Sequence, residues 1–285
     1  MASATPYTKD GRFLVSKTPI SGGLKSDIKR AVKLIGGFEE VIEDGDTVTI
    51  KPNFNTADPY PASSDPEFIR ALGELLLEAG VEKIRIIDSS TLGVSTREVA
   101  KKIGFNEVAD ALDAELIFLD ENEWVKVDFP RGKFLKKGSI GKPLLDLGKL
   151  VLAPCLKTHR LARFTASMKL FVGWIKHRER LGMHARRLEQ KAVDLASYFR
   201  PSLIVMDARK CFVTGGPASG QLECSGFILA SGDMVSIDVE GVRILQSYGT
   251  KNRLDRNVWE LPQIAHAVEI GIGAKSDAEI ELVVN

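Results

Sequence analysis

Basic and titratable side chains are concentrated in one segment of the chain, residues 155–184. This segment contains three of the four histidines and only one acidic residue, Glu179, although the whole chain has a net charge of +1. Clustered positive charge in a nearly neutral protein favours binding of an anion such as phosphate or a carboxylate. Histidine is a common general acid or base, and lysine can pair with an anion or form a covalent adduct. We therefore predict His159, Lys169 and His184 as the catalytic candidates.

The cysteine and histidine patterns give no sign of a bound metal. Cys155, Cys211 and Cys224 are far apart in the sequence and form no C-x-x-C pair. We expect neither a disulfide framework nor an iron–sulfur cluster held by this chain, and we interpret the thiols as small buried side chains in a reducing cytoplasm. The histidines also lack the H-E-x-x-H spacing of a helical zinc site, so no metal ligands are predicted. The identity of any cofactor stays open.

Polar residues follow several apolar runs of the chain. Lys51 and Asn53 come after VTI, Asp88 follows IRII, residues 157–159 follow KLVLAP, and Asp207 ends LIVMD. Ligands of open α/β sheets bind beyond the carboxyl ends of parallel strands. These groups are therefore expected along one edge of a sheet. Ordinary strand-ending turns contain the same residue types, and that alternative stays open.

Two backbone features are further candidates for the site. Ser64 opens a predicted helix, whose free N–H groups attract anions, although plain capping by Asp65 explains the same pattern. The loop GGPASGQ lets a ligand approach the backbone closely, and an ordinary hairpin turn fits it equally well. It matches neither the P-loop nor the dinucleotide-binding pattern. The predicted ligand- or cofactor-binding residues are Lys51, Asn53, Ser64, Lys157, Thr158, Asp207, Gly215, Gly216 and Gly220.

Strand and helix patterns alternate along the chain and must position these residues. Helices are expected over residues 24–42, 66–80, 95–105, 186–199, 234–249 and 261–270, and strands over 48–51, 83–90, 115–120, 124–129, 149–154, 202–208, 226–231 and 279–284. Such alternation predicts an α/β fold, with a mainly parallel sheet flanked by helices and a small hairpin excursion around residues 121–147. A solvated helix face is expected for four arginines, Arg178, Arg180, Arg186 and Arg187.

We expect a single α/β folding unit over residues 1–285. The alternative is a division into two lobes, 1–150 and 151–285.

Composition narrows the class of protein. The net charge of +1 argues against general nucleic-acid binding. No apolar run approaches the roughly 18–20 residues that span a bilayer, and the N-terminus has no signal-peptide pattern. The sequence therefore predicts a cytoplasmic protein without a membrane or nucleic-acid partner. It leaves open a homodimer and a redox partner protein.

Eight motifs, taken in order, resemble those of the DUF362 family, a widespread prokaryotic family of uncharacterised function. They are GDTVTIKPN, SSDPEFIRALGELLLEAG, IIDSS, LAPCLKTH, TASMKLFVGWI, LIVMDA, GGPASG and SGDMVSIDVEG, and they cover residues from about 45 to about 245. The resemblance implies that characteristic family positions are occupied by Lys51, Asn53, Lys157, His159, Lys169, His184, Asp207, Gly216 and Asp238.

The chain also departs from its relatives. Many of them carry an attached ferredoxin module with two four-iron clusters, whose cysteines are missing here, so electron transfer is not carried over. The family commonly has Asn where this chain has Leu170. The order His159, Lys169, His184 is distantly similar to lactate-racemase-type enzymes, in which a histidine transfers protons, a lysine tethers a nickel-pincer nucleotide and a later histidine ligates nickel. Ala166-Ser167 replaces the glycine pair that usually precedes that lysine.

Three functions fit these observations. The first is binding of a small phosphate- or carboxylate-bearing ligand or cofactor at the sheet edge, with acid–base chemistry by His159 and an anion anchor at Lys169. The second is a non-catalytic accessory or ligand-binding protein of an iron–sulfur or redox system. The third is an analogue of the nickel-pincer racemases.

Overall fold

A nine-stranded sheet forms the centre of the protein, for which the computed structural model describes residues 6–284. The strand order is β1-β2-β14-β11-β8-β3-β4-β5, and β15 pairs with β2. The strands of this sheet are β1 (Thr8–Lys9), β2 (Arg12–Pro19), β3 (Thr47–Lys51), β4 (Lys83–Asp88), β5 (Glu115–Phe118), β8 (Lys149–Leu152), β11 (Leu203–Ala208), β14 (Phe227–Ser231) and β15 (Ile280–Val284).

The sheet is mostly parallel, which confirms the predicted fold class. β11, β8, β3, β4 and β5 run parallel to one another, whereas β14 pairs antiparallel with both β11 and β2. Within the described residues, three antiparallel hairpins lie outside the sheet: β6 (Trp124–Asp128) with β7 (Lys137–Gly141), β9 (Lys157–His159) with β10 (Arg163–Thr165), and β12 (Cys211–Gly215) with β13 (Gly220–Glu223). The first of them is the predicted excursion around residues 121–147.

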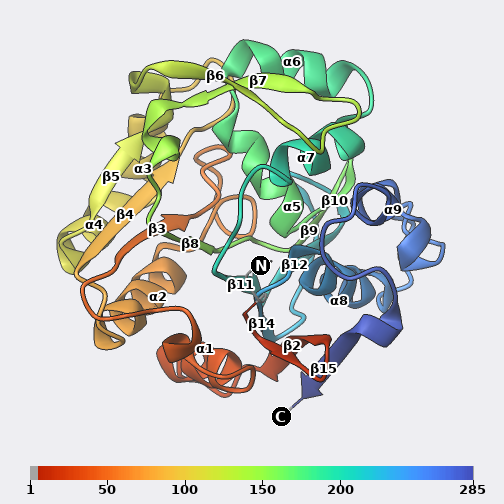
Figure 1. The fold of residues 1–285 in the computed structure, drawn as a ribbon, viewed down its shortest axis with the longest axis horizontal. Coiled ribbons are helices and arrows are strands. Elements are labelled where there is room, and N and C mark those ends of the chain that lie inside the picture. The colour runs from red at the N-terminus through yellow and green to blue at the C-terminus, as the bar shows by residue number, and fades with distance from the viewer. Residues whose placement is uncertain (1–5, 285) are drawn as a thin grey trace.

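Helices cover both faces of the sheet (Figure 1). They are α1 (Leu24–Lys33), α2 (Pro66–Glu78), α3 (Thr96–Lys102), α4 (Phe105–Leu112), α5 (Ser167–Leu170), α6 (His177–Ala185), α7 (Leu188–Ala196), α8 (Met234–Gln246) and α9 (Pro262–Glu269). Val151 of β8 belongs to the apolar cluster that contains residues of α1, α2 and α4, while its neighbours Leu150 and Leu152 belong to the cluster that contains residues of α5, α7 and α8. This alternation along one strand divides the core into two apolar layers.

Some predicted helix boundaries are wrong. The helix expected over residues 24–42 ends at Lys33, because Gly36 and Gly37 adopt φ values of +135° and +100° that a helix cannot contain. A short 3-10 turn, Phe38–Glu40, replaces the rest of the expected helix. The predicted cap at Asp65 is confirmed, since its side chain accepts a hydrogen bond from a backbone N–H group in the first turn of α2, and Asp233 caps α8 in the same way.

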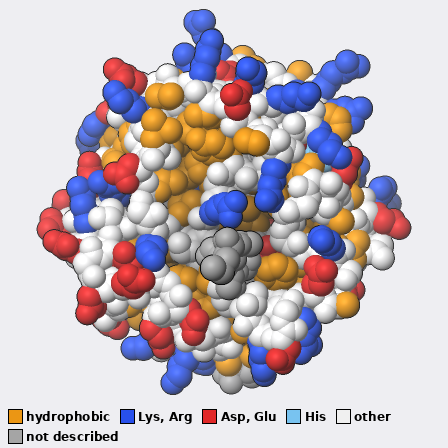
Figure 2. Space-filling model, in the orientation of Figure 1, with side chains coloured by type: hydrophobic (Ala, Val, Ile, Leu, Met, Phe, Trp, Pro, Cys, Tyr) orange, Lys and Arg blue, Asp and Glu red, His pale blue; other side chains and the backbone are white. Residues whose placement is uncertain are grey.

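Charges of both signs are mixed on the face shown in Figure 2, mostly around its rim, while hydrophobic side chains gather nearer its centre. No single-sign patch dominates this view, in keeping with the net charge of +1. Over residues 6–284, none of the helices has the length and apolar character needed to span a membrane.

Candidate functional site

The carboxyl ends of the parallel strands open into a cavity of about 380 Å³. Lys51 ends β3 and Asp88 ends the neighbouring strand β4, while Lys157 and His159 lie on β9 after the end of β8. Helices α5 and α6 close the cavity with Lys169 and other side chains. The cavity therefore lies where ligands of open α/β sheets bind.

Size alone does not identify this cavity as the site. A larger hollow of about 570 Å³ includes Arg131, Arg200 and Asp233 in its lining. The two arginines there are exposed, and the Asp233 carboxylate is already used to cap α8. Burial of several cationic groups is what distinguishes the sheet-edge cavity.

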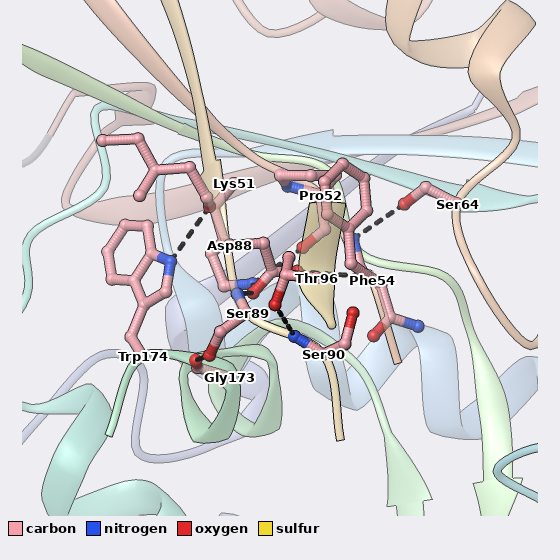
Figure 3. A network of polar contacts seen from close by, with 12 residues as sticks. Lys51, Pro52, Phe54, Ser64, Asp88, Ser89, Ser90, Thr96, Gly173 and Trp174 are labelled. Atoms are coloured by element: carbon pink, nitrogen blue, oxygen red, sulfur yellow. Dashed lines mark hydrogen bonds and ion pairs between the residues drawn. The ribbon is translucent and has the colours of Figure 1, made fainter. Parts of the chain in front are cut away.

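Asp88 organises one wall of the cavity (Figure 3). Its carboxylate accepts hydrogen bonds from Lys51 Nζ at 2.5 Å, from the Phe54 backbone N–H at 2.8 Å and from the Ser89 backbone N–H at 2.7 Å. Burial lowers the pKa of Lys51 to about 8, and the attraction of Asp88 opposes that shift. A Cβ added to Gly173 would lie 2.5 Å from Asp88 Oδ1, so the chain passes very close to this ion pair. Lys51 is thus a paired, fixed cation.

Arg180 forms a second wall, and its predicted position on a solvated helix face is wrong. The side chain is only 7% exposed. It donates from Nη1 to the Ser90 carbonyl at 2.5 Å, from Nε to the Ile175 carbonyl at 2.9 Å, and from Nη2 to the Ser89 hydroxyl. Burial lowers its pKa to about 10. The other three arginines of this group, Arg178, Arg186 and Arg187, are exposed as predicted.

Lys157 and Asn53 hold the loop between β3 and α2. Lys157 Nζ donates to the carbonyl oxygens of Pro61 at 2.7 Å and Ala62 at 3.0 Å, and Asn53 Nδ2 donates to the same Ala62 oxygen at 2.9 Å. Burial lowers the pKa of Lys157. The Ser64 hydroxyl accepts from the Asn53 backbone N–H at 2.8 Å. Ser64 therefore supports the loop and does not line the cavity.

Lys169 differs from the other cations of the cavity. It is 9% exposed, and within residues 6–284 its ammonium has neither a hydrogen-bond acceptor nor an ion-pair partner. Burial, the charge of Lys157 and the charge of Arg180 lower its pKa to about 7. Asp238 of α8 fixes the start of α5, because its carboxylate accepts from the backbone N–H groups of Ser167 at 2.7 Å and Met168 at 3.1 Å.

The two histidines of the cavity have opposite tautomers. His159 Nδ1 accepts from the backbone N–H groups of Leu161 and Ala162, both at 3.1 Å, so the ring proton lies on Nε2. Burial, followed by the charges of Lys169, His184 and Lys157, lowers the His159 pKa to about 2. His184 Nδ1 lies 2.7 Å from the Arg180 carbonyl oxygen. A carbonyl can only accept, so His184 Nδ1 carries the proton and Nε2 of the neutral ring has a free lone pair.

Two buried hydroxyl groups complete the polar lining. Ser90 Oγ and Thr165 Oγ1 have no hydrogen-bond partner among the residues that the structure describes, and both residues line the cavity. Buried polar atoms are rarely left unpaired in native proteins. Both oxygens are themselves buried, so their side chains would have to rotate to reach a ligand in the cavity.

The structure brings half of the predicted site residues together. Lys51, Asn53, Lys157, His159, Lys169 and His184 all line the cavity. Thr158 and Asp207 lie behind it, where the Thr158 hydroxyl donates to the Phe212 carbonyl at 3.0 Å and Asp207 pairs with Arg209 at 2.7 Å. Ser89, Ser90, Thr165 and Arg180 were missed. Ser89 and Ser90 could have been found from their position directly after the apolar strand β4.

The glycine loop forms a hairpin turn that reaches the cavity only through Pro217. Gly215 pairs with Gly220 across β12 and β13. A Cβ on Gly216 would lie 1.9 Å from the Thr158 carbonyl oxygen, so glycine allows the turn to pack directly on β9. In the structure, the glycine loop therefore contacts the backbone of β9, and no ligand role is needed to explain its glycines.

These features define an α/β protein whose parallel strands end at a buried, cationic cavity. Residues 48–243 match the family described as "Domain of unknown function (DUF362)", and the chain belongs to this family, as its motifs predicted. The thylakoid-associated protein sll1697 of Synechocystis sp. (strain ATCC 27184 / PCC 6803 / Kazusa) is 25% identical over 252 residues, which cover 84% of this chain and 75% of that protein.

The chain is also similar to a solved structure, the lactate racemase apoprotein from Thermoanaerobacterium thermosaccharolyticum. It has a TM-score of 0.49 and 13% sequence identity over 84% of this chain, which spans 59% of the racemase chain. A likeness at this level assigns no activity. Within residues 6–284, no group of three or more His, Cys, Asp or Glu side chains is placed to hold a metal ion.

Proposed function

We propose that the sheet-edge cavity binds a small anionic ligand bearing a phosphate or carboxylate group, with Lys169 as its anchor. The observation that carries this proposal is Lys169, a residue that is 9% exposed and whose ammonium has no partner in the described part of the chain. An isolated buried charge costs several kcal/mol. A bound anion would remove that cost by pairing with the ammonium.

The charge balance of the cavity supports an anion. Lys51, Lys157, Lys169 and Arg180 are buried and line it, and among the described lining residues Asp88 is the only carboxylate. Asp88 is already used by Lys51. The remaining positive charge suits a ligand with several acceptor oxygens.

The histidine tautomers suggest separate roles at the bound ligand. Nε2–H of His159 is a fixed hydrogen-bond donor, because its Nδ1 is held by two backbone N–H groups and its pKa lies far below neutrality. Nε2 of His184 has the lone pair that a general base requires. We therefore assign proton transfer to His184 and orientation of the ligand to His159, which changes the role expected for His159 from the sequence.

Anion binding should weaken as the pH rises. The Lys169 pKa is lowered to about 7, so the ammonium of the free protein is fully charged only below that pH. Affinity for phosphate or for a dicarboxylate such as succinate should be highest below pH 7 and fall by up to about tenfold per pH unit above it. Isothermal titration calorimetry across this range measures the effect.

Two variants test the anchor. Lys169→Met should weaken binding by at least about tenfold, and the matched control Arg186→Ala should leave it unchanged, because Arg186 is exposed and outside the cavity lining. Equal binding by both variants, or an affinity that does not change with pH, would exclude Lys169 as the anchor.

A further inference from the structure

The cavity contains three lysines that differ in what their amino groups contact. Lys51 Nζ is paired with Asp88 at 2.5 Å, and Lys157 Nζ donates to two carbonyl oxygens. Only Lys169, among the described cavity lysines, has an amino group without any protein acceptor. Its nitrogen is therefore free to react with a molecule in the cavity.

We propose that Lys169 is a nucleophile that forms an imine with a small anionic carbonyl compound. This inference rests on the proposed function, since the other cations of the same cavity, Lys157 and Arg180, would hold the anionic group of the compound while Lys169 reacts. A buried lysine close to other cations is a recognised arrangement for an activated amine. Arg180 and Lys157 are the neighbouring cations here, because both line the same cavity as Lys169. A cavity of about 380 Å³ suits a small molecule.

The reaction is balanced without an oxidant or a reductant. The Lys169 nitrogen attacks the carbonyl carbon, and a proton moves from that nitrogen to the carbonyl oxygen to give a carbinolamine. Loss of that hydroxyl group as water then forms the C=N bond. His184 Nε2 can accept the proton from the nitrogen and return it to the departing oxygen, while the His159 Nε2–H group can donate to the carbonyl oxygen.

The protonation state of Lys169 supports this chemistry. An ordinary lysine, with a pKa of about 10.4, is almost wholly protonated at neutral pH and is a poor nucleophile. Burial and two neighbouring positive charges lower the Lys169 pKa to about 7, so much of the amine is neutral there. Imine formation should therefore increase through pH 7, whereas binding of a simple anion should decrease.

Borohydride trapping tests the inference on the whole chain. The protein is incubated with pyruvate or dihydroxyacetone phosphate, which combine a carbonyl with a carboxylate or a phosphate, and is then reduced. Peptide mapping by mass spectrometry should locate the reduced adduct on Lys169 for at least one of the two compounds, which also shows whether the site prefers a 2-oxo acid or a phosphate ester. Lactate and glycerol 3-phosphate carry the same anions without the carbonyl and should give no adduct.

Two variants separate a specific adduct from surface reaction. Lys169→Arg keeps the positive charge and should lose the adduct while still binding lactate or glycerol 3-phosphate. Lys176→Arg changes an exposed lysine of the same segment and should keep the adduct. An adduct spread over exposed lysines, or no adduct although lactate or glycerol 3-phosphate binds, would overturn the imine proposal and leave the anion site standing. Failure of all four compounds to bind or react would overturn both proposals.

Discussion

Lys169 is the residue at which the needs of folding and of ligand binding conflict. Its side chain is buried in a cationic cavity and its amino group has no partner in the described structure, so the charged form of Lys169 destabilises the free protein. Groups that destabilise the unliganded protein are typical of functional sites. The same contact becomes favourable once an anion or an imine-bound ligand pairs with the surrounding charges.

Lys169→Met should stabilise the free protein, because it removes a buried charge and keeps a side chain of similar length. The expected gain at pH 7 is about 1–4 kcal/mol in the free energy of unfolding. The measurement is urea unfolding of the parent protein and the variant.

The Lys169 pKa is lower in the folded state, where it is about 7, than in the unfolded chain. The parent should therefore gain stability as the pH rises from about 7 toward 10, and the variant should lack this gain. Identical pH dependence in both proteins would contradict a buried, unpaired Lys169.

At the scale of elements, helix α8 positions the short helix α5 through one side chain. The buried Asp238 carboxylate accepts from the backbone N–H groups of Ser167 and Met168, directly before Lys169. Both N–H groups belong to the first turn of α5, where helical partners are missing. Asp238 therefore acts on the site as a positioning residue and does not line the cavity.

Asp238→Asn should weaken anion binding by displacing Lys169. The amide NH₂ would face a backbone N–H donor, so one of the two hydrogen bonds is lost and the fold is destabilised by about 1–3 kcal/mol. The readout that separates positioning from general destabilisation is a double-mutant cycle with Lys169→Met, measured by calorimetry with phosphate. In the Lys169→Met background, Asp238→Asn should cause no further loss of affinity. Additive losses would place the effect of Asp238 elsewhere.

The elements of the parallel sheet and the cations at its edge could be predicted because each depends on local sequence. Lys51 and Lys157 directly follow apolar runs, and such positions share one edge in any parallel sheet. Arg180 could not be predicted, since its burial depends on the Ser90 carbonyl, 90 residues away in sequence. The end of α1 was missed because the apolar spacing continues past Gly36 and Gly37, while the positive φ values there end the helix.

At the scale of the whole molecule, both halves of the chain contribute strands to one sheet. β3, β4 and β5 come from the first half, and β11 and β14 from the second, with β8 between the two groups. The cavity has the same mixed origin, because Lys51 and Asp88 precede residue 150 while Lys169 and Arg180 follow it.

We accordingly propose that residues 1–285 unfold as a single unit and not as two lobes, 1–150 and 151–285. Separating the lobes would break the pairing of β2 with β14 and β15, and that of β3 with the end of β8, and would expose the core packed around these strands. Thermal unfolding followed by far-ultraviolet circular dichroism and by tryptophan fluorescence should give coincident transitions. The fluorescence reports on both halves, because Trp124 lies in β6 and the buried Trp174 follows α5. Two resolved transitions, or a stable proteolytic fragment ending near residue 150, would favour the two-lobe alternative and would require a site assembled between separately folding parts.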